Sequence, residues 1–505
     1  MAPTVSASQC AAAFSLLALF VFSFLPGPAF AADPSQATQY CLGCHKSLHP
    51  GIVSDWQSSR HARVTPAKAL QKDELKRRVS AESVPGDLRN STVGCAECHT
   101  LNPGKHPDTF AHNGKKVHAV VTPEDCAVCH PQEREQFSRN KMSQAYGNLM
   151  DNKLYGQLIT AVNGVPRVDA EKGVVEEQAP DRLSNEDSCL ACHGTRVEYE
   201  GTEERSTKLG PQELPVYAGW PNQAVGRINP DGSKGSCSSC HTRHRYSIEM
   251  ARQPHTCSKC HKGPDVPAYK VYEVSKHGNI FSSSGSEWDL KSVPWTPGED
   301  FAAPTCASCH ASLLTGPQGK VIAERTHQMN DRLSERIFGL PYAHPQPQSA
   351  DTSVIENKAG LPLPTELSGE PASEYLISEK EQEKRRERLQ AVCSACHSEQ
   401  WTRGHFEKLD RTVETSNQLT REATKLMETA WAEGLAQGPG QGGSIADEPL
   451  ELLWLEQWLF YANSVRFASA MMGADYGVFE RGRWHQHKNL REMAEKLRQL
   501  RSMNE

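Results

Sequence analysis

Hydrophobic and polar positions follow two different patterns along this chain. Before about residue 410, short apolar stretches alternate with segments rich in Gly, Pro and Ser, which predicts short helices with little sheet. Beyond that point, apolar residues recur at helical spacing over 407–433, stop at AQGPGQGGS and resume at DEPLELLW, with a proline near the helix start. Trp454, Trp458 and Tyr461 follow at intervals of four and three residues, so they form one stripe of a helix. The pattern predicts a helical tail that ends in a charged helix over about 482–500.

Two further segments lie between these regions. Residues 343–376 contain many prolines, which predicts an extended segment on the surface. From 378 to 391 the polar pattern is again helical. The apolar stripe of the tail needs a partner, either the rest of the chain or another copy of it, and we favour the second as a subunit interface.

Cysteine usage changes this picture. The chain has 17 cysteines, and all except Cys10 lie in the sequence Cys-x-x-Cys-His. A disulfide framework does not require a histidine after every second cysteine, and zinc ribbons leave that position free. The motifs are Cys41/Cys44/His45, Cys95/Cys98/His99, Cys126/Cys129/His130, Cys189/Cys192/His193, Cys237/Cys240/His241, Cys257/Cys260/His261, Cys306/Cys309/His310 and Cys393/Cys396/His397.

The spacing of the motif explains its chemistry. Residues i, i+3 and i+4 share one face of a helical turn. Two thiols can therefore form thioethers with the vinyl groups of a haem while the histidine binds the iron as proximal ligand. The sequence predicts eight covalently attached haems c, packed among short helices in a mainly α multihaem cytochrome c fold. Haem volume would replace the side-chain core in a chain that is only 37% hydrophobic.

The remaining histidines are candidate distal ligands. The chain has 21 histidines, eight of them in the motifs, and His485 and His487 lie in the tail, where we expect surface positions. This number allows seven haems with two histidine ligands and one haem with an open position, but it does not assign the ligands. The preferred distal ligands are His61, His118, His244, His255, His277, His327 and His405. Met142 is a candidate axial ligand or a core residue.

The N-terminus and the charge indicate the compartment and exclude one class of partner. An apolar run over 11–24, followed by Ala29-Phe30-Ala31, resembles a signal peptide over 1–31, although no Lys or Arg precedes the run. We therefore expect a periplasmic protein with an octahaem domain over 32–410 and a helical region over 411–505. The net charge is −6 and no basic stripe with aromatic residues occurs, so a nucleic-acid partner is not expected.

Several stretches resemble the octahaem hydroxylamine oxidoreductase family. They are residues 220–278, the fourth motif followed by Gly194, RTHQMNDRL, and DEPLELLWLEQW with MMGADY in the tail; the order and number of motifs also match. The resemblance implies a mostly helical homotrimer with seven bis-histidine haems. It also implies that the haem held by Cys189, Cys192 and His193 is catalytic and converts small nitrogen compounds, hydroxylamine or nitrite, while a cytochrome or quinone-linked carrier exchanges electrons with the protein.

The resemblance also suggests pocket residues and a direction of reaction. Family members place an Asp-His pair beside the sixth motif, where this chain has Asp265 followed by Val266, which cannot relay a proton. Oxidative members cross-link a neighbouring subunit's tyrosine to the catalytic haem; Tyr476 is the best candidate here, but the residues after it, GVFERGRW, depart from the family pattern. Tyr342 is a weaker candidate for the distal pocket. These departures favour reduction slightly over oxidation.

Two other functions are compatible with the motifs. One is a pure electron-transfer protein in which all eight irons are six-coordinate. The other is a different type of octahaem tetrathionate or nitrite reductase, which often uses lysine ligation, but no Cys-x-x-Cys-Lys occurs in this chain.

Overall fold

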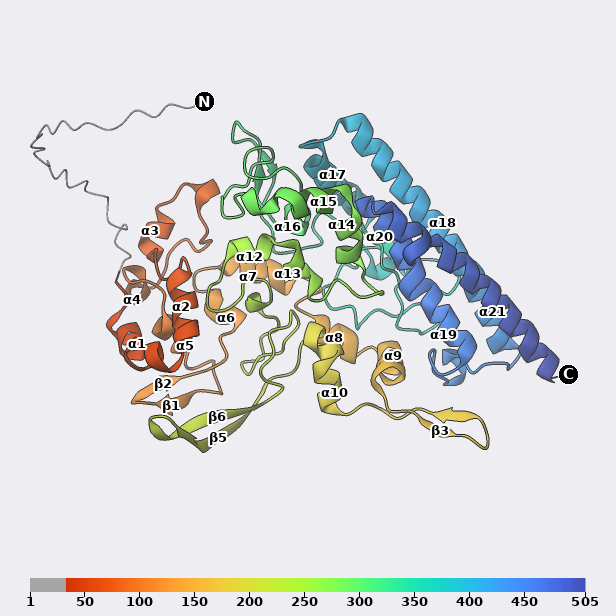
Figure 1. Cartoon of the computed structure of the whole chain (residues 1–505), viewed down its shortest axis with the longest axis horizontal. Coiled ribbons are helices and arrows are strands. Elements are labelled where there is room, and N and C mark those ends of the chain that lie inside the picture. Colours follow the sequence, from red (N-terminus) through yellow and green to blue (C-terminus); the bar gives the residue numbers. More distant parts are fainter. Residues whose placement is uncertain (1–32, 505) are drawn as a thin grey trace, which may run out of the picture.

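A computed structural model describes residues 33–504 and shows a mainly helical chain with a few two-stranded ladders (Figure 1). This confirms the predicted fold class. The expected signal peptide lies outside the described residues. No helix within 33–504 combines the length and apolarity that a membrane span requires.

The first part of the chain consists of short helices that are joined by irregular segments. Three of the haem-binding motifs form one-turn helices of their own, because a single turn presents both thiols and the imidazole on one face. These are α5 (Cys95–His99), α11 (Cys189–His193) and α16 (Cys306–His310), while Cys41, Cys44 and His45 lie within α1 (Gln36–Leu48). The other helices are α2 (Pro50–Ser58), α3 (Pro66–Leu70), α4 (Gly86–Arg89), α6 (Pro123–Cys126), α7 (Pro131–Ser138), α8 (Ala145–Met150), α9 (Lys153–Asn163), α10 (Arg182–Asp187), α12 (Ile248–Arg252), α13 (Pro254–Ser258), α14 (Ala268–Val274), α15 (Lys276–Ser284) and α17 (Glu379–Ser394).

The strands form antiparallel ladders of two strands each. The longest, β5 (Glu198–Thr207) with β6 (Gly210–Ala218), lies beside β1 (Phe110–His112) and β2 (Lys115–Val117) at one end of the molecule (Figure 1). The pair β3 (Arg167–Asp169) and β4 (Val174–Glu176) projects as an arm from the other side (Figure 1). Two short ladders, β7 (Leu314–Thr315) with β8 (Val321–Ala323) and β9 (Glu335–Arg336) with β10 (His344–Pro345), lie within the body.

Long helices form the tail, as the pattern predicts. They are α18 (Glu399–Ala432), α19 (Pro449–Leu455), α20 (Asn463–Met471) and α21 (Arg483–Asn504), with π-helical segments over Glu456–Ala462 and Tyr476–Glu480. Trp431, Trp454, Trp458, Met427 and Met493 are buried together in the largest apolar cluster of the described residues. The expected boundary at residue 410 lies inside α18, so one continuous helix joins the motif-bearing region to the tail.

The structure corrects the predicted surface position of the proline-rich segment 343–376. It is irregular, as expected, but much of it is buried rather than extended over the surface. The backbone of Ala343 exchanges hydrogen bonds with the Asn417 side chain of α18, and Leu363 joins the apolar cluster of the tail. The segment therefore packs between the two regions. The predicted helices over 378–391 and 482–500 are confirmed as α17 and α21.

Candidate functional site

The motif histidines are oriented as metal ligands. The Nδ1 of His99 donates to the carbonyl of His118 (2.8 Å), that of His193 to Ala145 (3.1 Å) and that of His310 to Met329 (3.2 Å). An Nδ1–H that donates to a backbone carbonyl leaves the opposite Nε2 deprotonated and able to bind a metal. The local backbone thus fixes both the tautomer and the direction of these rings.

A continuous cavity of about 2440 Å³ runs among the motifs. Both cysteines and the histidine of each motif from the third to the eighth line it, and Cys98 of the second motif also reaches it. Protein interiors are otherwise close-packed, so a space of this size lined by paired thiols and imidazoles has the dimensions for large prosthetic groups. The donor set of paired thiols with an adjacent imidazole fits haem c, and the cysteines and histidines of the Cys-x-x-Cys-His motifs would hold it.

Other histidines lie opposite those of the motifs. Two metal–nitrogen bonds of about 2 Å and two ring radii of about 1.1 Å place the centroids of two axial imidazoles about 6 Å apart. Five pairs of rings have centroid separations of 6.1–6.4 Å: His45–His112, His99–His244, His130–His61, His241–His327 and His397–His277. Four of these partners are among the predicted distal ligands. His112, on β1, was not, because nothing in the sequence around it distinguishes it from a surface histidine.

The other predicted distal ligands lie differently. His118 is also 6.2 Å from His99, but its own carbonyl binds the Nδ1 of His99, so it belongs on the side of that ring away from the iron. His405 is buried beside the His277–His397 pair, with Trp401 stacked between His397 and His405. His255 is exposed on α13. Among residues 33–504, no second imidazole faces His193, His261 or His310 at the axial spacing.

At the fourth motif two backbone segments approach each other closely. The helix α11 ends at Gly194, whose φ of 97° is rarely adopted by other residues, and a Cβ there would lie 2.3 Å from the nitrogen of Arg227. Gly226 approaches equally closely, since a Cβ would lie 2.3 Å from the His193 carbonyl. The glycine after this motif is thus required by the close contact between α11 and the segment over 226–227.

Two charged residues act on His193. Burial lowers the pKa of His193, the negative charge of Asp265 raises it and the positive charge of Arg336 lowers it. Arg336 and Asp265 line the same cavity as His193, together with Tyr155 of α9. Asn463 of α20 donates to the backbone carbonyl of Asp265 (2.8 Å) and holds this segment in place. The sequence pointed to Asp265 but not to Arg336.

A second pair of groups extends this pocket. His344 and Arg336 are directly opposed across the ladder of β9 and β10, so their side chains share a face. Burial and the Arg336 charge lower the pKa of His344 to about 3, and its Nε2 is buried without a hydrogen-bond partner, as is the Nε of Arg336. Burial also lowers the pKa of Lys141, another cavity residue near Arg336, to about 7. Buried polar atoms without protein partners are uncommon, and a bound water, ion or ligand can satisfy them.

The two predicted tyrosines lie outside this pocket. The hydroxyl of Tyr342 donates to the Leu367 carbonyl (2.7 Å), and its ring packs toward α18 rather than the cavity. Tyr476 is buried within its own chain against Val271 and Ala468. Neither hydroxyl is directed toward His193 of the same chain. Met142 lines the cavity, and its backbone N–H donates to Asn140.

Comparisons with known proteins find multihaem cytochromes c. The family model "Seven times multi-haem cytochrome CxxCH" matches residues 211–330 and 369–442, and "Cytochrome c554 and c-prime" matches 38–124 and 125–212. A solved structure described as a hypothetical multiheme protein is 42% identical, with a TM-score of 0.87 over 94% of this chain and 97% of that one.

Two proteins of Kuenenia stuttgartiensis are more distant. A probable nitrite reductase-hydroxylamine oxidoreductase fusion protein is 24% identical over 418 residues, which is 79% of this chain but 38% of the relative's length. The chain thus spans well under half of the curated relative that it matches. A chain of a reducing HAO-like protein complex has the same fold, with a TM-score of 0.61 at 19% identity, over 93% of this chain and 86% of that one.

Proposed function

The chain belongs to the multihaem cytochromes c of the hydroxylamine oxidoreductase-like family, and on this premise we propose that it is a periplasmic octahaem reductase of nitrite or hydroxylamine. The proposed reaction site is the haem held by Cys189, Cys192 and His193. The observation that carries the proposal is that His193 faces no second imidazole among the described residues and lines the same cavity as Asp265 and Arg336, the latter opposite His344 in the β9–β10 ladder.

The other motifs supply the electron path. Five histidine pairs have the spacing of two axial ligands, which supports six-coordinate irons that exchange electrons without binding substrate. We propose eight haems in total, one in each motif, with seven six-coordinate and the fourth open; the five imidazole pairs support five of the seven, and the second ligands of the haems held by His261 and His310 are not among these pairs. Bound haem supplies one-electron carriers and, where one axial position stays free, an iron that can take a small ligand.

The pocket residues have separate proposed roles in binding the anion and in transferring protons. The Arg336 guanidinium is a permanent positive charge with a donor that has no partner in the protein, so it suits the oxygens of a small anion such as nitrite. Asp265 carries the carboxylate that can accept and pass on protons near His193. His344 offers its buried Nε2 on the same face as Arg336. Reduction of nitrite to ammonium consumes six electrons and eight protons, so a site that both attracts an anion and delivers protons matches this chemistry.

The reductive direction rests on two departures. Val266 replaces the proton-carrying histidine of the oxidative relatives, and the residues after Tyr476, GVFERGRW, depart from the family pattern. Tyr476 itself packs against Val271 and Ala468 of its own chain. The printed descriptions of both Kuenenia stuttgartiensis proteins include a reducing function, which supports the same direction. The Trp454–Trp458 stripe packs within its own chain and not against another copy, which corrects the expected use of that stripe as an interface. We further propose a homotrimer in which other parts of the tail contribute the interface, and a cytochrome or quinone-linked carrier as the electron donor.

The test uses the purified holoprotein. We expect an intact mass that equals the mature chain plus eight haems, a high-spin ferric EPR signal that cyanide abolishes, and oxidation of the dithionite-reduced protein by nitrite with ammonium as product. An entirely low-spin spectrum without cyanide binding would contradict the proposal and support the alternative, a pure electron-transfer protein. Peptide mapping that finds Tyr476 linked to the Cys189–Cys192 haem peptide would reverse the direction to oxidation.

A further inference from the structure

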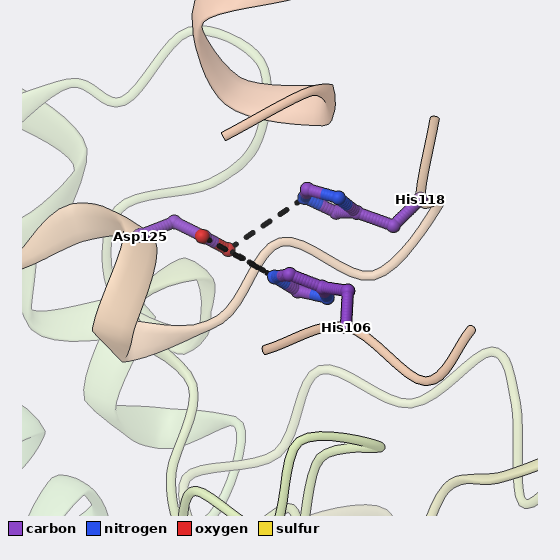
Figure 2. A group of neighbouring side chains, drawn as sticks. All are labelled: His106, His118 and Asp125. Carbon is purple, nitrogen blue, oxygen red and sulfur yellow. Dashed lines mark hydrogen bonds and ion pairs between the residues drawn. The ribbon is translucent and has the colours of Figure 1, made fainter. Parts of the chain in front are cut away.

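A buried charged cluster lies between the second and third motifs. His106, His118 and Asp125 are grouped together (Figure 2), and none of them is exposed. The Nδ1 of His106 lies 3.1 Å from Asp108, and its Nε2 lies 3.1 Å from Asp125. Because both ring nitrogens face carboxylate oxygens, both donate, and His106 is an imidazolium between two carboxylates.

The cluster is complete without a metal ion. The rings of His106 and His118 are stacked with centroids 3.5 Å apart and planes 2° apart (Figure 2). A metal lies close to the plane of each imidazole that binds it, and two parallel planes at this separation share no such point. The carboxylate of Asp125 is already occupied, since it accepts from the Thr122 N–H (2.9 Å) and the Asn102 amide (3.0 Å) as well. Hydrogen bonds thus hold His106 and Asp125, while the ring of His118 is positioned by stacking on His106 and lies with its Nε2 3.7 Å from Asp125.

The cluster is joined to the second motif through His118. Its ring is stacked on the His106 imidazolium, and its backbone carbonyl accepts the Nδ1–H of His99 at 2.8 Å. Hydrogen bonds to the two carboxylates fix His106, and stacking on His106 positions the ring of His118. The His118 carbonyl in turn orients the proximal histidine, His99. The hydrogen bond to the Nδ1 of an axial histidine sets the orientation and basicity of that ligand.

We propose that His106, Asp108 and Asp125 are positioning residues that lower the reduction potential of the haem held by Cys95, Cys98 and His99. One imidazolium and two carboxylates leave one net negative charge buried beside this haem. Negative charge favours the ferric over the ferrous iron, and burial weakens solvent screening. The inference rests on the haem attachment and on the His99–His244 ligation proposed above, but not on the substrate or on the direction of catalysis.

Two substitutions with opposite signs test this inference. Asp125→Asn removes a negative charge while keeping an oxygen for the Thr122 N–H, so the potential of this haem should rise. His106→Gln removes the positive charge, so the potential should fall. Each change should alter the ratio of oxidised to reduced haem about tenfold at a fixed potential, or about 60 mV for one electron. Asp169→Asn, on the projecting β3 arm, is the matched control and should leave the potential unchanged.

The measurement is an EPR-monitored redox titration of the holoprotein. The signal of this haem is first identified as the low-spin signal that changes in His244→Met. Shifts in the same direction for both variants, or shifts no larger than that of Asp169→Asn, would overturn the inference. If His106→Gln does not accumulate as folded protein, Asp108→Asn should raise the potential, whereas Tyr217→Phe, which removes the 2.9 Å donor to Asp108, should lower it.

Failure here and failure of the proposed function give different results. Opposite potential shifts in a protein without nitrite turnover would support the inference and contradict the reductase. Normal nitrite reduction with unchanged potentials would support the reductase and contradict the inference about the cluster.

Discussion

The motif-bearing region and the helical tail reach a folded state by different means. The tail has long helices and an apolar cluster in which Trp431, Trp454 and Trp458 meet edge to face with centroids 5.6 and 5.7 Å apart. The motif-bearing region has one-turn helices, small apolar clusters and a continuous cavity of about 2440 Å³. The tail thus obtains its core from side chains, whereas the other region obtains it from the cofactors that its cysteines bind.

The difference explains the composition of the chain. A region whose interior is filled by porphyrin does not need runs of apolar residues. Polar residues, glycine and proline are therefore tolerated close to the centre of that region. The tail needs the regular spacing of large apolar side chains because nothing else fills its interior. The same difference separates the two kinds of experiment that follow, since loss of haem should affect one region and loss of a tryptophan the other.

The largest effect should follow from production of the chain without haem attachment. A cavity of this size left empty removes most of the packing of residues 33–397, so this region should lose its structure. Hydrogen exchange followed by mass spectrometry should show fast exchange there and slower exchange in α18–α21, whereas the holoprotein should be protected in both. Equal protection of both regions in the haem-free chain would show that the cofactors are not the core.

Next in size is the loss of the charged groups beside His193. Arg336→Gln should lower nitrite turnover by about 10²–10³-fold, the cost of one preorganised donor, and Asp265→Asn by about 10²–10⁴-fold. The low-spin EPR signals should remain unchanged in both variants, because neither residue is an axial ligand. Arg403→Gln, on an exposed part of α18, is the matched control and should retain full turnover. Unchanged turnover in Arg336→Gln or Asp265→Asn would remove that residue from the site.

A tryptophan in the tail should affect stability rather than chemistry. Trp454 is buried and its Nε1 donates to the Thr424 hydroxyl (3.0 Å), so Trp454→Ala should lower the free energy of unfolding of the tail by about 3–5 kcal/mol. Chemical denaturation followed by far-UV circular dichroism measures this loss, and haem content by mass should not change. Trp484→Ala is the matched control, because Trp484 is 59% exposed and should cost less than about 0.5 kcal/mol. Similar losses in both variants would contradict the assignment of Trp454 to the core.

The smallest effect concerns a buried acid in the tail. Glu451 accepts a hydrogen bond from Trp431 Nε1 (2.9 Å), and burial together with Asp447 raises the pKa of Glu451 to about 8. Because the folded-state pKa lies above the unfolded value, stability is fully present below the unfolded pKa and is lost as the pH rises through about 8. Glu451→Gln should flatten the pH dependence of the unfolding midpoint over this window. The exposed Glu422→Gln should leave it unchanged; a flat wild-type profile would contradict the raised pKa.

The sequence predicted the candidate site unevenly. The motif residues were evident because covalent attachment demands fixed spacing, and Asp265 followed from a family resemblance. Arg336, His344 and His112 gave no signal, since each depends on which strand lies opposite which: Arg336 faces His344 across one ladder, and His112 faces His45 from a hairpin. The prediction of a surface position for the proline-rich segment was wrong. Composition indicates local backbone conformation, but it does not show whether another element, here α18, covers the segment.

The sequence by itself determined the cofactor class, the mainly helical fold and the long helices of the tail. These properties depend on local spacing: thiols three residues apart, an imidazole next to them, and apolar side chains on one helical face. Only the tertiary structure decided which histidines face each other, that Tyr476 is buried in its own chain, and that His106 lies between two carboxylates beside the second motif. These relations join residues far apart in the chain, so the packing of whole segments fixes them and no local pattern records them.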